Sequence, residues 1–220
     1  MYQCVVFDMD GTLVNSYEGI DAAYRWACQQ MDIPFPGEGF VYRAIGAPLL
    51  LVWQEACGLS PRDAQRAAAY YRDYYARAGQ KQAELYGGMT DVLQKLKKAG
   101  LSLCVATLKQ EGFAKEILRG FGVLSLFDTV RGMDQNDSLT KAGLILECIR
   151  DSGASRRSTI LVGDSEYDAD GAKKAGVDFL AVTYGFGFRN GEIPPEDASL
   201  IAESPDDIAR LLAPDMGNHE

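Results

Sequence analysis

Two aspartates near the start of the chain, Asp8 and Asp10, have the type and spacing that suggest chemistry. They follow the apolar run 4–7, which predicts a short buried strand, and Gly11 lets the backbone turn after them. Because side chains alternate between the two faces of a strand, both carboxylates lean the same way. Crowded carboxylates repel each other and are costly to bury unpaired, and a divalent cation relieves both problems. Alone, the pattern is equally typical of a solvated acidic turn.

Other polar residues follow the ends of later apolar runs. Thr107 comes directly after the run 101–106, and Asp164 follows the run 158–162, with Asp168 one helical turn further on. In open parallel sheets, ligands bind at the carboxyl ends of the strands. We therefore expect these side chains to converge with the first two aspartates on one rim.

The elements that must position these residues fall into two blocks. Residues 16–84 show helical patterns and no convincing strand, with helices expected at 16–31, 40–45, 48–57 and 61–79. Four tyrosines in the last of these helices are expected to pack against neighbouring helices. From residue 87 onward, helices alternate with strands, which indicates a parallel, doubly wound sheet. The expected strands lie at 101–106, 127–130, 158–162 and 179–182, and the expected helices at 89–99, 111–120, 140–152, 167–175 and from 204.

This order predicts an α/β fold of the Rossmann type with a helical insertion. Residues 1–15 and 85–220 would form the core, and residues 16–84 would form an α-helical cap over the strand ends. The 220 residues are enough for one domain with such an insertion.

Composition excludes several classes of function. The net charge of −9 argues against a nucleic-acid partner. No apolar run is long enough to cross a bilayer, and the first residues lack the pattern of a signal peptide. Five scattered cysteines without a C-x-x-C pair read as free thiols and favour the cytoplasm. The only histidine, His219, lies in a polar tail, which argues against histidine-based triads and zinc sites.

Acids, a hydroxyl and a lysine are suited to phosphoryl transfer. Oxygen ligands without nitrogen or sulfur select Mg²⁺. One carboxylate can attack phosphorus, and another can protonate the leaving oxygen and then activate water. A cation and a hydroxyl stabilise the charge on the phosphoryl oxygens.

The motifs resemble, in order, those of the haloacid dehalogenase-like hydrolases. The residues that carry the resemblance are Asp8-x-Asp10-Gly11-Thr12-Leu13, Thr107, a lysine within 137–143, and Gly163-Asp164-x-x-x-Asp168. The similarity spans nearly the whole chain and is closest to the phosphoglycolate phosphatase-like branch, which carries a helical cap. It implies a Mg²⁺-dependent phosphomonoester hydrolase that forms an aspartyl-phosphate and acts on a small phosphorylated metabolite.

The resemblance also implies a role for each residue. Asp8 would be the nucleophile and a metal ligand, and Asp10 the general acid and base, with its main-chain carbonyl on the metal. Asp164 would complete the metal ligands. Thr107 and Lys141 would hold the phosphoryl group, and Asp168 would orient the metal shell or Lys141. The further expected phosphate or substrate contacts are the backbone amides near Gly11 and Leu108, together with Lys109 and Arg43.

Several alternatives stay open. The dehalogenating members lack the second aspartate, so Asp10 favours phosphate esters. A sugar phosphomutase on the same fold is the nearest alternative, although the histidine usual in that group is missing. A receiver-type domain or a non-catalytic phosphate-binding protein fits less well. The substrate is open between phosphoglycolate-like and 5′-nucleotide-like compounds, and the chain is expected to be a monomer or a homodimer.

Overall fold

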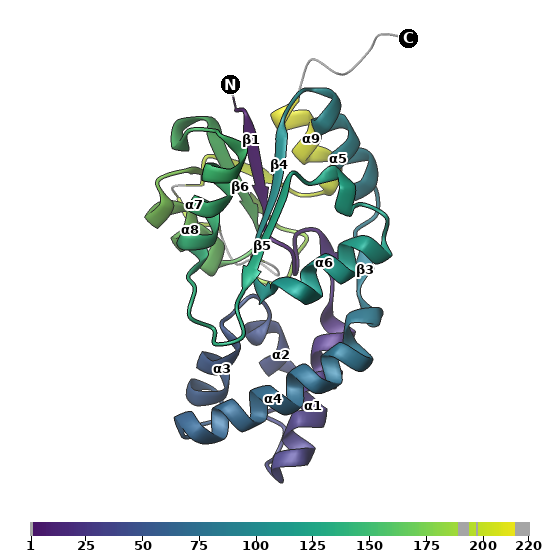
Figure 1. The fold of residues 1–220 in the computed structure, drawn as a ribbon, viewed down its shortest axis with the longest axis vertical. Helices are drawn as coiled ribbons and strands as arrows, with labels where there is room; N and C mark the ends of the chain where they lie inside the picture. The colour runs from purple at the N-terminus through teal and green to yellow at the C-terminus, as the bar shows by residue number, and fades with distance from the viewer. Residues whose placement is uncertain (1, 189–193, 197, 214–220) are drawn as a thin grey trace.

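A six-stranded sheet forms the centre of the computed structural model, which describes residues 2–188, 194–196 and 198–213. The strand order is β5-β4-β1-β6-β7-β8, and every neighbouring pair is parallel (Figure 1). The strands are β1 (Cys4–Phe7), β4 (Ser102–Gln110), β5 (Thr129–Met133), β6 (Thr159–Gly163), β7 (Asp178–Val182) and β8 (Leu200–Ala202). From β1 the chain continues on one side to β4 and β5 and later returns to β6 on the other side. The predicted doubly wound parallel sheet is therefore confirmed.

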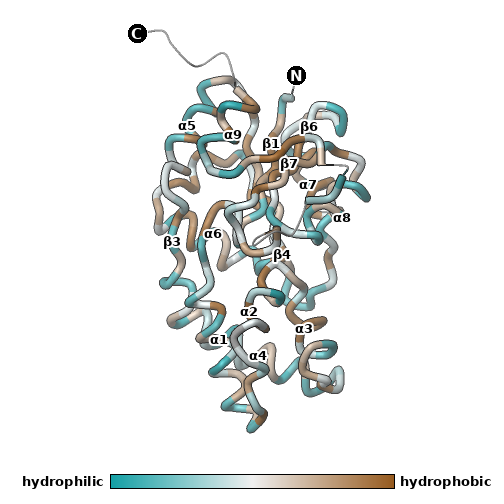
Figure 2. Tube along the Cα trace, turned by 180° about the vertical axis from the view of Figure 1, so that it is seen from behind, coloured by the Kyte–Doolittle hydropathy of each residue, from teal (hydrophilic) through white to brown (hydrophobic). Residues whose placement is uncertain are grey.

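Alternating side chains make both faces of the sheet apolar. In β1, Val5 and Phe7 belong to one buried cluster, and Cys4 and Val6 belong to the other. The strands β1 and β7 stand out as hydrophobic segments inside the molecule (Figure 2). Helices cover each face because neither can stay in water. They are α5 (Met89–Lys98), α6 (Glu111–Gly120) and α9 (Pro205–Leu212) on the first face, and α7 (Lys141–Ser152) and α8 (Glu166–Ala175) on the second.

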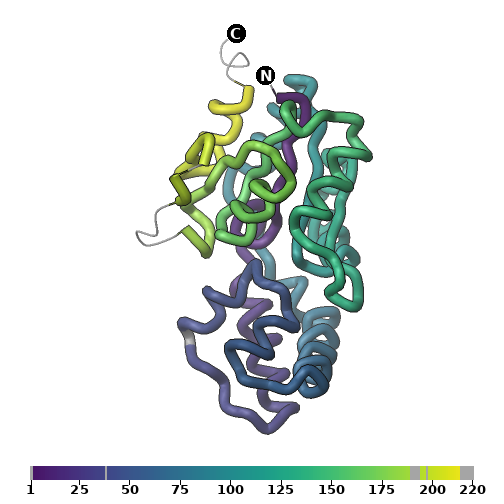
Figure 3. The backbone as a smooth tube through the Cα atoms, turned by 90° about the vertical axis from the view of Figure 1, so that its left-hand side faces the viewer, coloured from purple at the N-terminus to yellow at the C-terminus, as the bar shows by residue number. Residues whose placement is uncertain are grey.

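Four helices gather beyond the carboxyl ends of the strands, and we call them the cap helices. They are α1 (Tyr17–Met31), α2 (Glu38–Ala44), α3 (Leu49–Glu55) and α4 (Pro61–Arg77). They form a lobe at the end of the molecule opposite the N-terminus (Figures 1 and 3). Within the described residues, no helix combines the length and the apolar character that crossing a membrane requires.

A short antiparallel ribbon joins the cap helices to the core. It pairs β2 (Val14–Asn15) with β3 (Glu84–Leu85), at the two points where the chain enters and leaves the helical block. Residues 16–84 were expected to contain no strand, and this expectation is wrong at Glu84, which belongs to β3. A strand of two residues is too short to show a period of two in the sequence.

Other element boundaries also differ from the prediction. The helix expected to reach residue 79 ends at Arg77 and gives way to a 3₁₀ turn at Gly79–Gln82. Strand β4 extends to Gln110, so Thr107 lies within it, where the pairing with β5 shifts register. The edge strand β8 was not predicted. His219 lies outside the described residues.

Candidate active site

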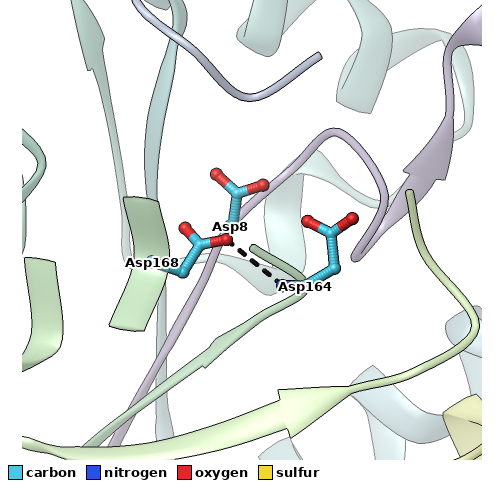
Figure 4. A group of neighbouring side chains, drawn as sticks. All are labelled: Asp8, Asp164 and Asp168. Atoms are coloured by element: carbon cyan, nitrogen blue, oxygen red, sulfur yellow. Dashed lines mark hydrogen bonds between the residues drawn. The ribbon is translucent and has the colours of Figure 1, made fainter. Parts of the chain in front are cut away.

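Three buried carboxylates meet where β1 and β6 end. Oxygens of Asp8, Asp164 and Asp168 all lie within 4.8 Å of one another, and none of the side chains is more than a few per cent exposed (Figure 4). Asp8 follows β1, Asp164 follows β6, and Asp168 stands in the first turn of α8. The parallel register of β1 and β6 explains why residues so distant in the sequence come together.

A glycine-rich loop holds Asp164 in place. Its Oδ2 accepts hydrogen bonds from the backbone amides of Phe186 at 2.6 Å and Gly187 at 3.2 Å. A Cβ atom at Gly185 would lie 2.4 Å from that oxygen, and a Cβ at Gly11, where φ is +90°, would lie 2.1 Å from it. Both glycines are therefore required by close packing around Asp164.

Lys141 supplies the positive charge at this rim. It begins α7, where the hydroxyl of Thr140 caps the helix, and its Nζ forms ion pairs with Asp8 and, at 2.7 Å, with Asp168. A Cβ at Gly171 of α8 would lie 2.5 Å from the side chain of Lys141, so that glycine leaves room for the lysine stem. Burial acts to lower the pKa of Lys141, but Asp168 and Asp8 outweigh it and raise the pKa.

Asp168 performs two tasks at once. One oxygen pairs with Lys141, and the other accepts hydrogen bonds from the Ser165 hydroxyl at 2.7 Å and from the amides of Ser165 and Asp164. The dashed line in Figure 4 marks the hydrogen bond from the Asp164 amide. The structure therefore brings Asp168 into contact with Lys141, one of its two expected partners.

The three carboxylates at the rim carry more negative charge than Lys141 alone can balance, so a further cation would stabilise them. Burial, together with the neighbouring Asp168 carboxylate, raises the pKa of Asp8 from 3.8 to about 7, although Lys141 opposes the shift. Burial and the charges of Asp168 and Asp8 also raise the pKa of Asp164. Three carboxylates share one lysine, and their oxygen donors are the set that Mg²⁺ prefers. The donor set therefore fits Mg²⁺, which Asp8 and Asp164 would hold.

The folding stability of the protein should depend on pH because of this excess of negative charge. In the unfolded chain Asp8 has its ordinary pKa, so the folded protein binds the proton more tightly, and stability falls as pH rises from about 4 through 7. Added Mg²⁺ should therefore raise the melting temperature more at about pH 8 than at about pH 5. Thermal unfolding in chelator and in Mg²⁺ at both pH values tests this expectation.

Two aspartate variants provide the contrast for that experiment. Asp164→Asn should lose most of the Mg²⁺ increment, whereas Asp170→Asn, at an exposed site on α8, should keep it. Equal increments at both pH values would contradict the expectation.

Asp10 stands apart from the three carboxylates. Its side chain accepts a hydrogen bond from Ser16 Oγ at 2.5 Å and forms an ion pair with Lys109 Nζ at 3.0 Å. The carboxylate of Asp10 lines a cavity between the core and the cap helices, and nothing in its contacts tests the expected metal contact of its carbonyl. Ser16 was not predicted as a site residue.

Lys109 links the core to the cap helices. Its Nζ donates a hydrogen bond to Tyr75 Oη of α4 at 2.8 Å, and only 6% of its side chain is exposed. Tyr75 packs against the neighbouring elements as expected, but it also lines the cavity, which the sequence analysis missed. The spacing of Tyr71 and Tyr75, four positions apart on one helix face, is the signal that could have found this face.

The remaining predicted residues divide between the site and the surface. Thr107 is buried in β4, where its hydroxyl accepts a hydrogen bond from the Lys109 amide, and Leu108 lines the cavity. The Gly11 amide itself donates to the Val14 carbonyl at 2.9 Å, and a phosphate contact of the amides near Gly11 stays a prediction. Arg43 is exposed and faces a separate hollow beside Tyr167 of α8 rather than the cavity at Asp10.

Comparison with known proteins places this site in a family. The sequence profile of the haloacid dehalogenase-like hydrolases matches residues 5–182. The chain belongs to this family, as its motifs indicated.

Relatives and solved structures carry phosphatase names. The 5′-nucleotidase of Pseudomonas aeruginosa is 31% identical over 187 residues, which cover 84% of this chain and 85% of that protein. The crystal structure of a predicted phosphatase from Clostridium acetobutylicum superposes with a TM-score of 0.90 at 32% identity, over 96% of this chain and 98% of the other. Phosphoglycolate phosphatases also match. The chain is therefore a member of a family whose relatives include proteins named as phosphatases.

One group of relatives has a different name. The tyrosine-protein kinase PtkA of Mycobacterium tuberculosis is 33% identical over 186 residues, which are 84% of this chain and 63% of that protein. The chain thus spans less than two thirds of the length of PtkA.

Proposed function

We propose that the protein is a Mg²⁺-dependent phosphomonoesterase that acts on a small phosphorylated metabolite of the cytoplasm through an aspartyl-phosphate. The observation that supports it most is the separation of two carboxylates. Asp8 lies among the acids and Lys141, whereas Asp10 lies beside a cavity that can hold a leaving group. Residues 16–84 would act as the cap over a core of residues 1–15 and 85–220.

The two aspartates have separate tasks in this mechanism. An oxygen of Asp8 attacks phosphorus, the bond from phosphorus to the alcohol oxygen breaks, and Asp10 gives its proton to the departing alcohol. Asp10 then takes a proton from water as that water attacks the phosphorus of the aspartyl-phosphate, which releases phosphate and restores Asp8. Lys141 and the Thr107 hydroxyl stabilise the phosphoryl oxygens, and Mg²⁺ would neutralise their charge.

Phosphate release from an aryl phosphate tests the proposal directly. We expect turnover with Mg²⁺ and none after chelation, with activity restored by added Mg²⁺. Undiminished turnover in chelator would contradict the role of the metal. With hexose 1-phosphates we expect free phosphate rather than an isomer, which separates hydrolysis from phosphomutase activity.

Lys109 should act as a positioning residue for Asp10. Lys109→Met keeps a stem of similar size but removes the charge that holds the Asp10 carboxylate, so we expect kcat to fall ~10–100-fold with a smaller change in KM. Tyr75→Phe keeps the ring contact with Phe113 and removes only the hydroxyl, so its effect should be smaller. Steady-state kinetics of both variants test whether kcat falls further in Lys109→Met than in Tyr75→Phe. Lys109→Arg, which keeps the positive charge, should restore kcat. An unchanged kcat in Lys109→Met would contradict it.

A further inference from the structure

The cavity beside Asp10 is walled mainly by aromatic and aliphatic side chains. Its volume, taken as the space open to the centre of a water-sized molecule, is about 60 Å³. The cap helices contribute Tyr24, Tyr71 and Tyr75, and Phe113 of α6 closes the side toward the core. Tyr71 and Tyr75 stack with their ring centroids 5.8 Å apart, and Tyr24 lies 4.8 Å from Tyr71. These walls favour a flat apolar group.

Each charged side chain that lines this cavity within the described part of the chain is paired with a neighbour. Two cations line it, Lys109 and Arg72, together with two carboxylates, Asp10 and Asp137. Lys109 lies 3.0 Å from Asp10, and Arg72 of α4 lies 2.7 Å from Asp137, which belongs to the segment between β5 and α7. The four side chains are mostly buried, and their formal charges cancel while Asp10 is ionised.

Among the residues that the structure describes, a second anionic group on the substrate would therefore meet no free cation in this cavity. To gain one, it would have to displace a carboxylate from Lys109 or Arg72 and leave that carboxylate buried without a partner, which is costly. Arg43, the cation expected to grip such a group, faces a different hollow. An uncharged leaving group incurs neither cost.

We propose that the substrate is the phosphate monoester of an uncharged alcohol that carries an aromatic or similarly flat apolar group. Phosphorylated hydroxy acids and bisphosphates are then poor substrates. The inference rests on the proposed phosphomonoesterase function and adds the chemical class of the leaving group. Gln110, which also lines the cavity, offers this group an uncharged amide.

Asp137 is the residue that makes this selectivity testable. Its Oδ1 pairs with Arg72, whereas its buried Oδ2 has no hydrogen-bond partner among the described residues. The backbone of Asp137 has φ of +51°, a conformation that asparagine adopts readily, so Asp137→Asn should preserve the turn. The variant leaves Arg72 with an uncompensated charge inside the cavity.

Pairs of substrates that differ by one carboxylate isolate the effect of charge. Benzyl phosphate is compared with 4-carboxybenzyl phosphate, and ethyl phosphate with phosphoglycolate, by phosphate release in Mg²⁺. For the wild-type protein, kcat/KM should be at least about tenfold higher for the uncharged member of each pair. Benzyl phosphate should also exceed ethyl phosphate.

Asp137→Asn should reduce the difference in kcat/KM between the uncharged and the carboxylated substrate. In Asp137→Asn we expect KM for 4-carboxybenzyl phosphate to fall about tenfold, because Arg72 can now pair with the substrate, with little change for benzyl phosphate. The matched control is Asp134→Asn, which lies on the same segment, bonds to Ser138 and does not line the cavity. The control should keep the selectivity of the wild-type protein.

The outcomes separate this inference from the function on which it rests. Faster hydrolysis of the carboxylated member by the wild-type protein would overturn the inference and leave the phosphomonoesterase proposal standing. Unchanged selectivity in a folded Asp137→Asn protein would overturn the role assigned to the Arg72–Asp137 pair. No phosphate from any of the four esters, with folded protein and Mg²⁺ present, would overturn the proposed function itself and this inference with it.

Discussion

Replacing Asp8 by asparagine is expected to abolish phosphate release. The neutral amide cannot attack phosphorus to form the acyl phosphate, so kcat should fall by about 10⁴-fold or more. The other groups at the rim stay in place, since Lys141 keeps its 2.7 Å ion pair with Asp168. Phosphate release from 4-nitrophenyl phosphate, measured in Mg²⁺, provides the test.

The fold should survive this substitution. Burial, together with the neighbouring carboxylates, raises the pKa of Asp8 to about 7, so a neutral side chain of the same shape avoids the cost of burying a charge and relieves repulsion. We expect the metal-free Asp8→Asn protein to melt at or above the wild-type temperature at about pH 8. Asp170→Asn, at an exposed site paired with Lys174, is the matched control and should keep full activity. Turnover of Asp8→Asn near the wild-type rate would eliminate Asp8 as the nucleophile.

Asp10→Asn should give the second-largest loss, and its size should depend on the substrate. Asparagine cannot give a proton to the departing alcohol, which an alkyl phosphate needs and 4-nitrophenyl phosphate does not. For an alkyl phosphate we expect kcat to fall by about 10²–10⁴-fold. Asparagine retains an oxygen that can accept the hydrogen bond from Ser16, so the local packing should remain.

The aryl substrate should reveal the second task of Asp10. Without a base to activate water, the aspartyl-phosphate should accumulate, so nitrophenol should appear in a burst equal to the enzyme concentration and be followed by slow turnover. Rapid-mixing kinetics measure both phases. Equal losses for both substrates, without a burst, would contradict the assignment of Asp10 as acid and base.

The sequence contained enough information for the core and for much of the site. The apolar run before Asp8 predicts a short buried strand, and the structure confirms it, with Val5 and Val6 in the apolar clusters on opposite faces of the sheet. The helix expected at 140–152 is α7, and the structure adds that the Thr140 hydroxyl caps its first turn. The convergence of Asp8 and Asp164 follows from the rule for parallel strands.

What could not be predicted depends on how the cap helices lie against the core. Lys109 was open between a surface lysine and a substrate contact, but its partners come from different parts of the chain, Asp10 of the core and Tyr75 of α4. No local pattern encodes such contacts. Arg43 lines a different hollow, because its direction depends on the orientation of α2, and its contact with substrate stays a prediction.

The covalent state of Asp8 during turnover tests the central claim most directly. The Asp10→Asn protein is mixed with 4-nitrophenyl phosphate and Mg²⁺, quenched in acid, treated with borohydride to reduce any acyl phosphate, and digested for mass spectrometry. We predict that the reduced residue is Asp8, in near one-to-one amount with the burst. A burst without modification of Asp8, or modification of a different carboxylate, would contradict the account.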